Sequence, residues 1–234
     1  MTSAARWTLV VVCAATAILL LDVTVVNVAL AQIERDLDAS FDELQWVIDA
    51  YAIALAAVLL LFGSLADRIG RRRVLIAGLV VFAAASLVCA LAGDPVVLDV
   101  GRGVQGIGAA AMFATSLALL AQEFEGGERR GFAFGVWGAV SGAAIALGPL
   151  VGGALVDAVA WEWIFIVNVP IATGLIVVTV ARVPESRPGR PEPVDLPGAI
   201  TFAAALTLLV LGLTRGNSEG WGDPLIVGTL AGGA

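Results

Sequence analysis

The sequence predicts an all-α integral membrane protein: a bundle of six spanning helices, one further span and the start of another. Three observations predict this class. First, 59% of the residues are hydrophobic and 14% are charged, whereas soluble domains average roughly 45–50% and about 25%. Second, the apolar residues form repeated runs of about the 20 residues that a spanning helix needs. Third, arginines gather in alternate connections between those runs, as in the cytoplasmic connections of multi-span proteins.

The apolar runs define the elements in chain order. Each run is long enough to cross a bilayer as a helix. The first is too long for the core of a cleavable signal peptide, so we expect it to be retained. The expected spans are 7–31, 44–65, 74–93, 95–121, 131–157, 160–182 and 196–214, with an eighth that begins near Asp223.

The basic residues predict the orientation. All thirteen are arginines, and the chain has no histidine. Ten fall on one side of the expected spans, only Arg35 and Arg215 fall on the other, and Arg102 lies inside a span. Because basic residues near span ends stay on the cytoplasmic side, we expect a multi-pass protein of the cell membrane with a cytoplasmic N-terminus. Trp46 and Tyr51 are expected to anchor at the membrane boundary, where aromatic rings concentrate.

Proline content divides the chain. Five prolines between Pro184 and Pro197 exclude a regular helix there. We therefore expect a six-helix bundle over 1–182, a cytoplasmic Pro-rich linker over 183–197 and an extra span with the start of the next over 198–234. The chain stops about a dozen residues into the eighth apolar run, short of a full crossing, so we expect a truncated sequence.

The connection between the second and third spans combines glycines with charge. It reads Gly-x-Leu-Ala-Asp-Arg-x-Gly-Arg-Arg-Arg. Glycine permits close backbone approach and a tight turn, and the aspartate can pair with the arginines or cap a helix N-terminus. A polybasic turn can also orient spans without gating, and both interpretations stay open. The predicted gating residues are Gly63, Asp67, Arg68, Gly70, Arg71 and Arg72.

Polar side chains inside the spans are the strongest functional signal, because a centrally placed charge costs at least about 2.5–3.5 kcal/mol. Asp22 lies about 13 Å, and Arg102 about 10 Å, from the external ends of their spans. We expect these two to pair, since a lone buried charge is far more costly. Gln105 faces the same side as Arg102, and Asn27 and Asp49 lie nearer the outer end. These five are predicted to line a proton-coupling and substrate cavity; a static ion pair, and an interfacial position for Asp49, are the alternatives.

The fifth expected span combines small residues with a proline. Glycines recur mostly at spacings of three, four or six, which lets helices approach closely in lipid. Proline removes a backbone hydrogen bond and kinks a helix. Plain packing and a hinge where one helix swivels on another both fit this pattern. The predicted hinge residues are Gly142, Gly148, Pro149, Gly152 and Gly153.

These motifs together resemble those of the major facilitator superfamily. The loop 63–73 is similar to its signature loop between the second and third helices, 102–110 to its fourth-helix motif and 148–153 to its antiporter motif. Segments 21–30 and 161–170 resemble the first and sixth helices of its fourteen-span drug:proton antiporter branch. The likeness covers essentially the whole chain.

The resemblance implies the N-terminal half of such a transporter, built from three-plus-three helix repeats. It also implies a latch at the signature loop that breaks and reforms as two halves rock, and an antiporter hinge that resists proton leak. Two positions depart from the branch: Ala31 replaces a usual proline, and Glu162 replaces a usual base. Neither touches a predicted transport residue, although Glu162 puts in doubt any salt bridge at that external corner.

We therefore expect a proton-coupled antiporter that exports small amphipathic or cationic compounds, as in multidrug efflux and drug resistance. Its partners are the small-molecule substrate, the proton and the lipid bilayer; no basic patch suggests nucleic acid. The proton gradient is the expected energy source, with no cofactor and no metal site. Substrate and proton would compete for Asp22, and such competition is the thermodynamic basis of antiport.

Three alternatives remain. The same fold can serve a metabolite symporter or uniporter. A membrane enzyme or non-transporting scaffold would need a catalytic constellation, and the sequence contains no metal cluster, no nucleophile with a base and no phosphate loop, so we expect no enzyme. The chain could also be an inactive fragment, because alternating access needs the missing C-terminal half. Cys13 and Cys89 lie in apolar spans and are expected to be packed thiols.

Overall fold

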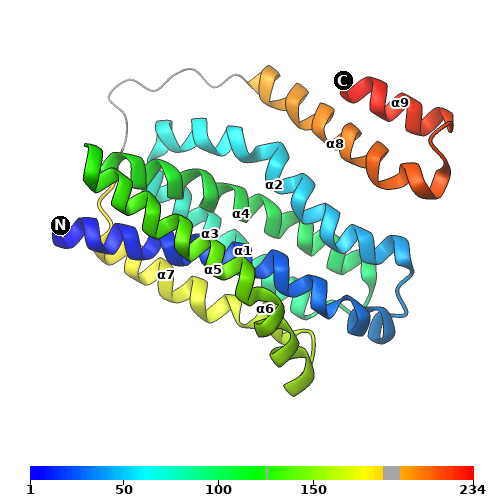
Figure 1. The fold of residues 1–234 in the computed structure, drawn as a ribbon, viewed down its shortest axis with the longest axis horizontal. Coiled ribbons are helices and arrows are strands. Elements are labelled where there is room, and N and C mark those ends of the chain that lie inside the picture. The colour runs from blue at the N-terminus through cyan, green and yellow to red at the C-terminus, as the bar shows by residue number, and fades with distance from the viewer. Residues whose placement is uncertain (125, 187–195) are drawn as a thin grey trace.

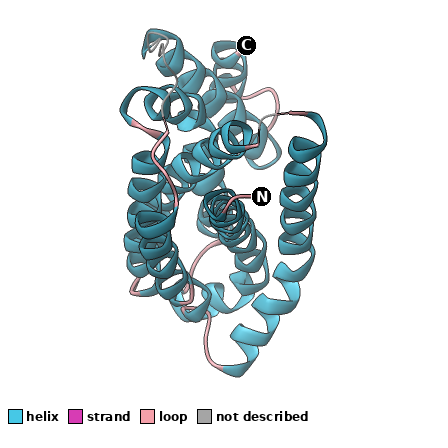
Figure 2. Cartoon of the chain, turned by 90° about the vertical axis from the view of Figure 1, so that its left-hand side faces the viewer, coloured by secondary structure: helices cyan, strands magenta, loops and turns pink. Residues whose placement is uncertain are grey.

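The protein is a bundle of long helices lying roughly side by side (Figures 1 and 2). The computed structural model describes residues 1–124, 126–186 and 196–234, and within these ranges all regular structure is helical. The helices in order are α1 (Ser3–Leu37), α2 (Phe41–Ile69), α3 (Arg71–Ala90), α4 (Pro95–Glu123), α5 (Gly127–Ala158), α6 (Trp163–Ile166), α7 (Asn168–Arg182), α8 (Leu196–Glu219) and α9 (Pro224–Gly233).

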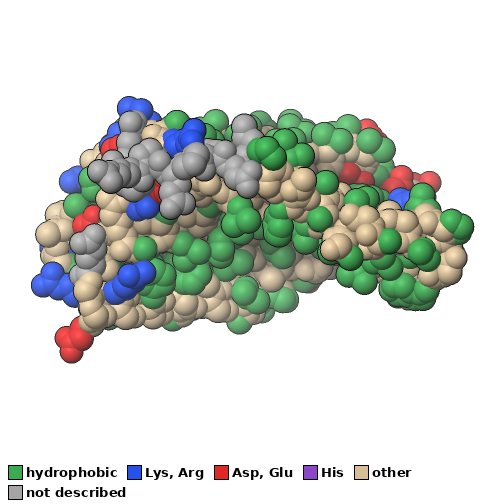
Figure 3. Space-filling model, turned by 90° about the horizontal axis from the view of Figure 1, so that it is seen from above, with side chains coloured by type: hydrophobic (Ala, Val, Ile, Leu, Met, Phe, Trp, Pro, Cys, Tyr) green, Lys and Arg blue, Asp and Glu red, His purple; other side chains and the backbone are tan. Residues whose placement is uncertain are grey.

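Seven helical segments of the described chain are long and apolar enough to cross a membrane, counting α6 and α7 together as the sixth crossing. The chain is thus a multi-pass membrane protein, and the predicted all-α class of a six-helix bundle followed by one further span is confirmed. On the face seen in Figure 3, most of the basic side chains gather at the end of the bundle where the N-terminus lies, and apolar side chains are spread over its middle.

Local chemistry explains where the helices begin. Ser40 and Glu43 form a capping box at the start of α2, which satisfies two of the free backbone N–H groups there. Asp94 accepts from the Val97 N–H at the start of α4, and Pro95 takes the first helical position, where its missing N–H costs nothing.

The sixth crossing differs from the single helix expected over 160–182. It is divided at Val167 into the short α6 and the longer α7. Pro170 lies in the first turn of α7 and cannot donate a hydrogen bond back to Ile166, which favours a break at this point.

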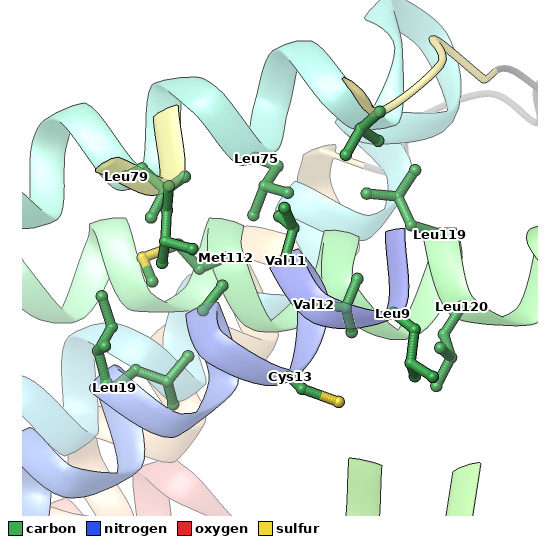
Figure 4. Packing of buried hydrophobic residues seen from close by; sticks show 14 of the residues in the cluster. Leu9, Val11, Val12, Cys13, Leu19, Leu75, Leu79, Met112, Leu119 and Leu120 are labelled. Carbon is green, nitrogen blue, oxygen red and sulfur yellow. The ribbon is translucent and has the colours of Figure 1, made fainter. Parts of the chain in front are cut away.

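Helix α1 occupies the middle of the bundle, with contacts to α2, α4, α5, α6 and α7. The most extensive contacts join α2 to α4, α3 to α4 and α1 to α5, while α8 packs on α2 and α9 on α8. The largest hydrophobic core gathers α1, α3 and α4 side chains, and Figure 4 shows Leu19, Leu79 and Met112 meeting there.

The extra span starts where the span over 196–214 was expected and ends later. Helix α8 begins at Leu196, and Pro197 fits there because proline is tolerated in the first turn of a helix. It ends at Glu219 rather than near residue 214. Of the predicted linker over 183–197, residues 187–195 lie outside the described residues, so the division into bundle, linker and extra span stays a prediction.

Two glycines allow α3 and α4 to pack closely. A Cβ on Gly108 of α4 would lie 2.7 Å from the backbone nitrogen of Phe82, and a Cβ on Gly78 of α3 would lie 2.9 Å from the carbonyl oxygen of Gly108.

We expect Gly108→Leu to destabilise the bundle by about 1–3 kcal/mol or more through overpacking. Gly103→Leu on the same helix meets open space and serves as the control. Equal unfolding midpoints for the two variants in lipid would contradict this packing.

Candidate functional site

A cluster of polar side chains lies buried between four helices. Asp22 of α1 and Arg102 of α4 are 3% and 1% exposed. Gln105 of α4, Ser86 of α3 and Asn168 of α7 complete the set, and all three are also buried. We call these five residues the polar cluster. Burial of a charge is tolerated only when it is paired and hydrogen-bonded, so the contacts inside the cluster decide whether it is stable.

The Asp22 carboxylate receives a hydrogen bond from each of three side chains. The Arg102 guanidinium donates through Nη1 to Oδ2 at 2.5 Å. Gln105 Nε2 and Asn168 Nδ2 donate to Oδ1 at 2.8 and 2.7 Å. Hydrogen bonds to an ionised group are the strongest kind in proteins. This arrangement suits an ionised Asp22, because a carboxylate only accepts hydrogen bonds.

Arg102 is fixed on its other sides as well. Its Nε donates to the Val47 carbonyl of α2 at 3.0 Å, and Nη1 also donates to Gln105 Oε1 at 2.7 Å. The guanidinium lies 4.3 Å from the centre of the Tyr51 ring and 5.8 Å from that of Phe165, within the range of a cation–π attraction. The charge is therefore held by α1, α2 and α4 together.

The structure brings some predicted residues together and leaves others apart. The expected pairing of Asp22 with Arg102 is confirmed, and Gln105 faces the same side. Asn27 and Asp49, in contrast, lie outside the polar cluster, so the structure does not bring all five residues together. Asn27 is exposed and donates to the Val23 carbonyl of its own helix.

Helical geometry explains both exclusions. Asn27 is five residues after Asp22, which turns it by roughly 140° around α1. Asp49 is two residues before Tyr51, so the two point to opposite sides of α2. Asp49 instead lines a small pocket with Trp46 and Arg215, among others. Any transport role for Asn27 and Asp49 stays a prediction.

Sequence reasoning missed three residues of this region. Tyr51 was expected at the membrane boundary, but it is 2% exposed, donates from its hydroxyl to the Leu19 carbonyl and covers Arg102. Asn168 stood in a noticed motif without a role. Ser86 is a single hydroxyl in an apolar run and accepts from Gln105 Nε2 at 2.8 Å. A polar residue inside an expected span is the only signal that could have found the last two.

A small cavity lies beside the polar cluster, between α1, α5 and the sixth crossing. Its volume is about 90 Å³. Asp22 and Asn168 are its polar lining residues, and apolar side chains such as Val25, Val151 and Leu155 form the rest of the wall. This volume is far below the roughly 300–1,000 Å³ of a pocket for a drug-sized ligand, but it leaves room for side-chain movement.

The predicted gating loop forms a tight turn at the other end of the bundle. Gly70 ends α2 and starts α3 with a φ of 114°, a conformation that L side chains rarely adopt. Asp67 and Arg71 form an ion pair at 2.9 Å. Arg71 also donates to the Ala118 carbonyl of α4 at 3.0 Å. The loop is thus fastened to α4. Gly63, expected to permit close approach, has open space around its Cβ position, so that expectation is wrong.

Glu185, just after the sixth crossing, contacts this turn. Its carboxylate accepts from the backbone N–H of Arg72 at 3.1 Å and lies 3.6 Å from the guanidinium of Arg73. Arg72 donates in turn to the Val183 carbonyl at 3.0 Å. Helix α3 has no side-chain cap of its own at Gly70, so Glu185 supplies a carboxylate where the helix dipole favours one.

The predicted hinge residues on α5 divide into two groups. A side chain at Gly148 would overlap Thr24 of α1, and one at Gly152 would lie 3.1 Å from Val25. These two glycines therefore let α5 approach α1 beside Asp22. Gly142 and Gly153 meet open space, and α5 runs through Pro149 as one helix. A hinge role for these residues stays a prediction.

No group of histidine, cysteine or carboxylate side chains suited to holding a metal ion occurs in the described part of the chain.

Comparison with known proteins gives consistent results. The family model described as Major Facilitator Superfamily matches residues 12–234. The chain is 42% identical to the puromycin resistance protein pur8 of Streptomyces alboniger, over 94% of this chain and 44% of that protein. It is 39% identical to the cephamycin export protein CmcT of Amycolatopsis lactamdurans, over 99% of this chain and 48% of that protein.

The fold has a match among solved structures. The crystal structure of the peptide transporter POT in complex with sulfate aligns with a TM-score of 0.68 and 18% identity, over 98% of this chain and 48% of that one. The chain thus spans about half the length of the proteins it matches.

The turn at Gly70 can be tested by substitution. A Cβ at this position would lie 2.6 Å from the Glu185 carboxyl group and would strain the backbone. We expect Gly70→Ala to displace Glu185 and to speed hydrogen exchange of the Arg72 amide at least about tenfold, because the amide loses a charged acceptor. Gly63→Ala, in open space, is the matched control. Unchanged exchange at Arg72 in Gly70→Ala would show that Glu185 does not depend on this glycine.

Proposed function

The chain belongs to the Major Facilitator Superfamily, and from this premise we propose that it forms part of a secondary transporter that exports small amphipathic or cationic compounds in exchange for protons. The observation that carries the proposal is the buried Asp22–Arg102 pair with its amide partners. A membrane protein holds such charges inside its bundle at a considerable cost, which favours a functional role over a purely structural one.

The relatives support export over the rival functions. Proteins similar to this chain are named for resistance to puromycin and methylenomycin A and for export of cephamycin. Each of those names describes outward movement of, or protection from, a small molecule. They favour an exporter over a metabolite symporter, and a transporter rather than an enzyme.

The proposed mechanism uses the two charge states of Asp22. When ionised, the carboxylate holds Arg102 or attracts a cationic substrate. When protonated from outside, it releases that partner and favours the other orientation of the bundle. Proton and substrate therefore bias the same two-state equilibrium in opposite directions. The proton gradient is the energy source, and no cofactor is needed.

The distribution of charge supports the proposed orientation. Arg6, Arg68, Arg129 and Arg182 lie near span ends on one side with most of the other arginines, so this side would face the cytoplasm of a cell membrane. The turn at Gly70, with Glu185 bound to it, then lies on the cytoplasmic side. There it would act as a latch that controls the closure of the transporter on that side.

We also propose that transport requires a second helical bundle. Alternating access needs two halves that move against each other, and this chain spans about half the length of its relatives. Helices α2 and α5 present large apolar side chains at the surface, including Leu60 and Leu150, which are 60% and 70% exposed. These faces would receive the second bundle.

Asp22→Asn tests the proposal most simply. The substitution keeps the shape of the side chain but removes its ionisation, so we expect coupled export to fall by about 5–150-fold, the usual range of coupling between two ligands. Export would be measured in vesicles that contain the whole transporter, with an imposed proton gradient. Asp36→Asn, exposed at the end of α1, is the control. Unchanged proton-driven export in Asp22→Asn would remove Asp22 from the coupling.

A further inference from the structure

Asn168 is a polar cluster residue to which neither the sequence nor the proposed mechanism gives a role. It is 4% exposed, and its Nδ2 donates to Asp22 Oδ1 at 2.7 Å and lies 3.5 Å from the hydroxyl of Ser86. It is the first residue of α7, directly after the division of the sixth crossing at Val167. It also lines the cavity beside Asp22.

Protonation of Asp22 would disturb the observed hydrogen bonds. An ionised carboxylate accepts from Arg102, Gln105 and Asn168 at once. A protonated carboxyl group carries a donor of its own. That new O–H would face side chains that also donate, and a buried donor without an acceptor costs free energy. One partner must therefore change from donating to accepting.

Two of the three partners cannot make this change. Arg102 has no acceptor atom. Gln105 is held at both ends of its amide: Nε2 donates to Asp22 and Ser86, while Oε1 accepts from Arg102 at 2.7 Å. Reversing Gln105 would turn its NH₂ group toward the guanidinium. Asn168 carries both an oxygen and an NH₂ group and has the cavity beside it.

We propose that Asn168 is a positioning residue whose side-chain amide changes orientation with the protonation state of Asp22. Its amide donates to the ionised carboxylate and reverses, so that its carbonyl oxygen accepts the proton of the neutral carboxyl group. This inference rests on the proposed role of Asp22 as the proton carrier. The break at Val167 allows the start of α7 to follow the amide without bending a continuous helix.

The other ionisable groups around Asp22 come from three helices. Arg102 lies on α4, Tyr51 on α2 and Cys89 on α3. The Tyr51 ring centre lies 4.3 Å from the Arg102 guanidinium, and Cys89 Sγ lies 3.9 Å from Gln105 Oε1. The α5 side of the cavity is formed by Val151 and Leu155, which are apolar. Among the cavity-lining residues, Asn168 is thus the uncharged one that can both donate to and accept from Asp22.

Two substitutions separate hydrogen bonding to Asp22 from the filling of space. Asn168→Leu keeps the number and branching of the side-chain heavy atoms but can neither donate nor accept, whereas Asn168→Ser leaves a void but can do both. We expect Leu to move the midpoint of the pH profile of proton-driven export by about one pH unit toward higher pH, since the ionised carboxylate loses one donor. Ser should keep the midpoint near that of the unchanged transporter. Thr179→Val, buried on the same helix with its hydroxyl bonded to the Leu175 carbonyl, should not move it.

The opposite order would overturn the proposal: if Asn168→Ser shifts the pH profile more than Asn168→Leu, Asn168 only fills space.

A second measurement tests the proposal if the variants fold too poorly for export to be measured. In the unchanged chain in lipid, the infrared band of the Asn168 side-chain carbonyl, identified by its loss in Asn168→Leu, should shift between acid and alkaline pH and stay fixed in Asp22→Asn. A band that never shifts would also overturn the proposal. If export by Asp22→Asn keeps its full pH dependence, the proposed role of Asp22 fails too, which separates the two outcomes.

Discussion

The ion pair between Asp22 and Arg102 is the constraint on which the arrangement of the bundle depends. Two opposite charges, 3% and 1% exposed, are stable in an apolar interior only if they meet and if their remaining hydrogen-bonding atoms are satisfied. That requirement fixes the facing sides of α1 and α4, draws the Val47 carbonyl and the Tyr51 ring of α2 onto the guanidinium, and brings Asn168 of α7 to the carboxylate. One pair thereby aligns four crossings.

Small residues then allow the other helices to close around this pair. Gly148 and Gly152 bring α5 against α1 at Thr24 and Val25, within a turn of Asp22. At the opposite end, Gly70 supplies the backbone shape that lets Glu185 reach the start of α3. A change of charge at Asp22 would therefore act on helices whose close contacts tolerate little added volume, and interfaces of this kind tend to switch between discrete packings.

Much of this structure could be predicted from the sequence, because its signals are local. The apolar runs define the crossings, and the depth of Asp22 and Arg102 within their runs predicts that they meet. The predictions that failed are those that depend on how a helix is rotated about its axis. Tyr51 and Asp49 are two residues apart on α2, and composition alone does not say which of them faces Arg102. The contact of Glu185 with the start of α3 joins segments far apart in the chain, and spacing within one segment cannot predict it.

A double-mutant cycle on the ion pair tests the central claim most directly. The free energy of unfolding would be measured in lipid for Asp22→Leu, Arg102→Met and the double variant. If the pair organises the bundle, each single change leaves a buried charge alone and costs about 3–5 kcal/mol, while the double variant loses much less than the sum. Additive losses, with the double variant destabilised by the full sum, would contradict the account.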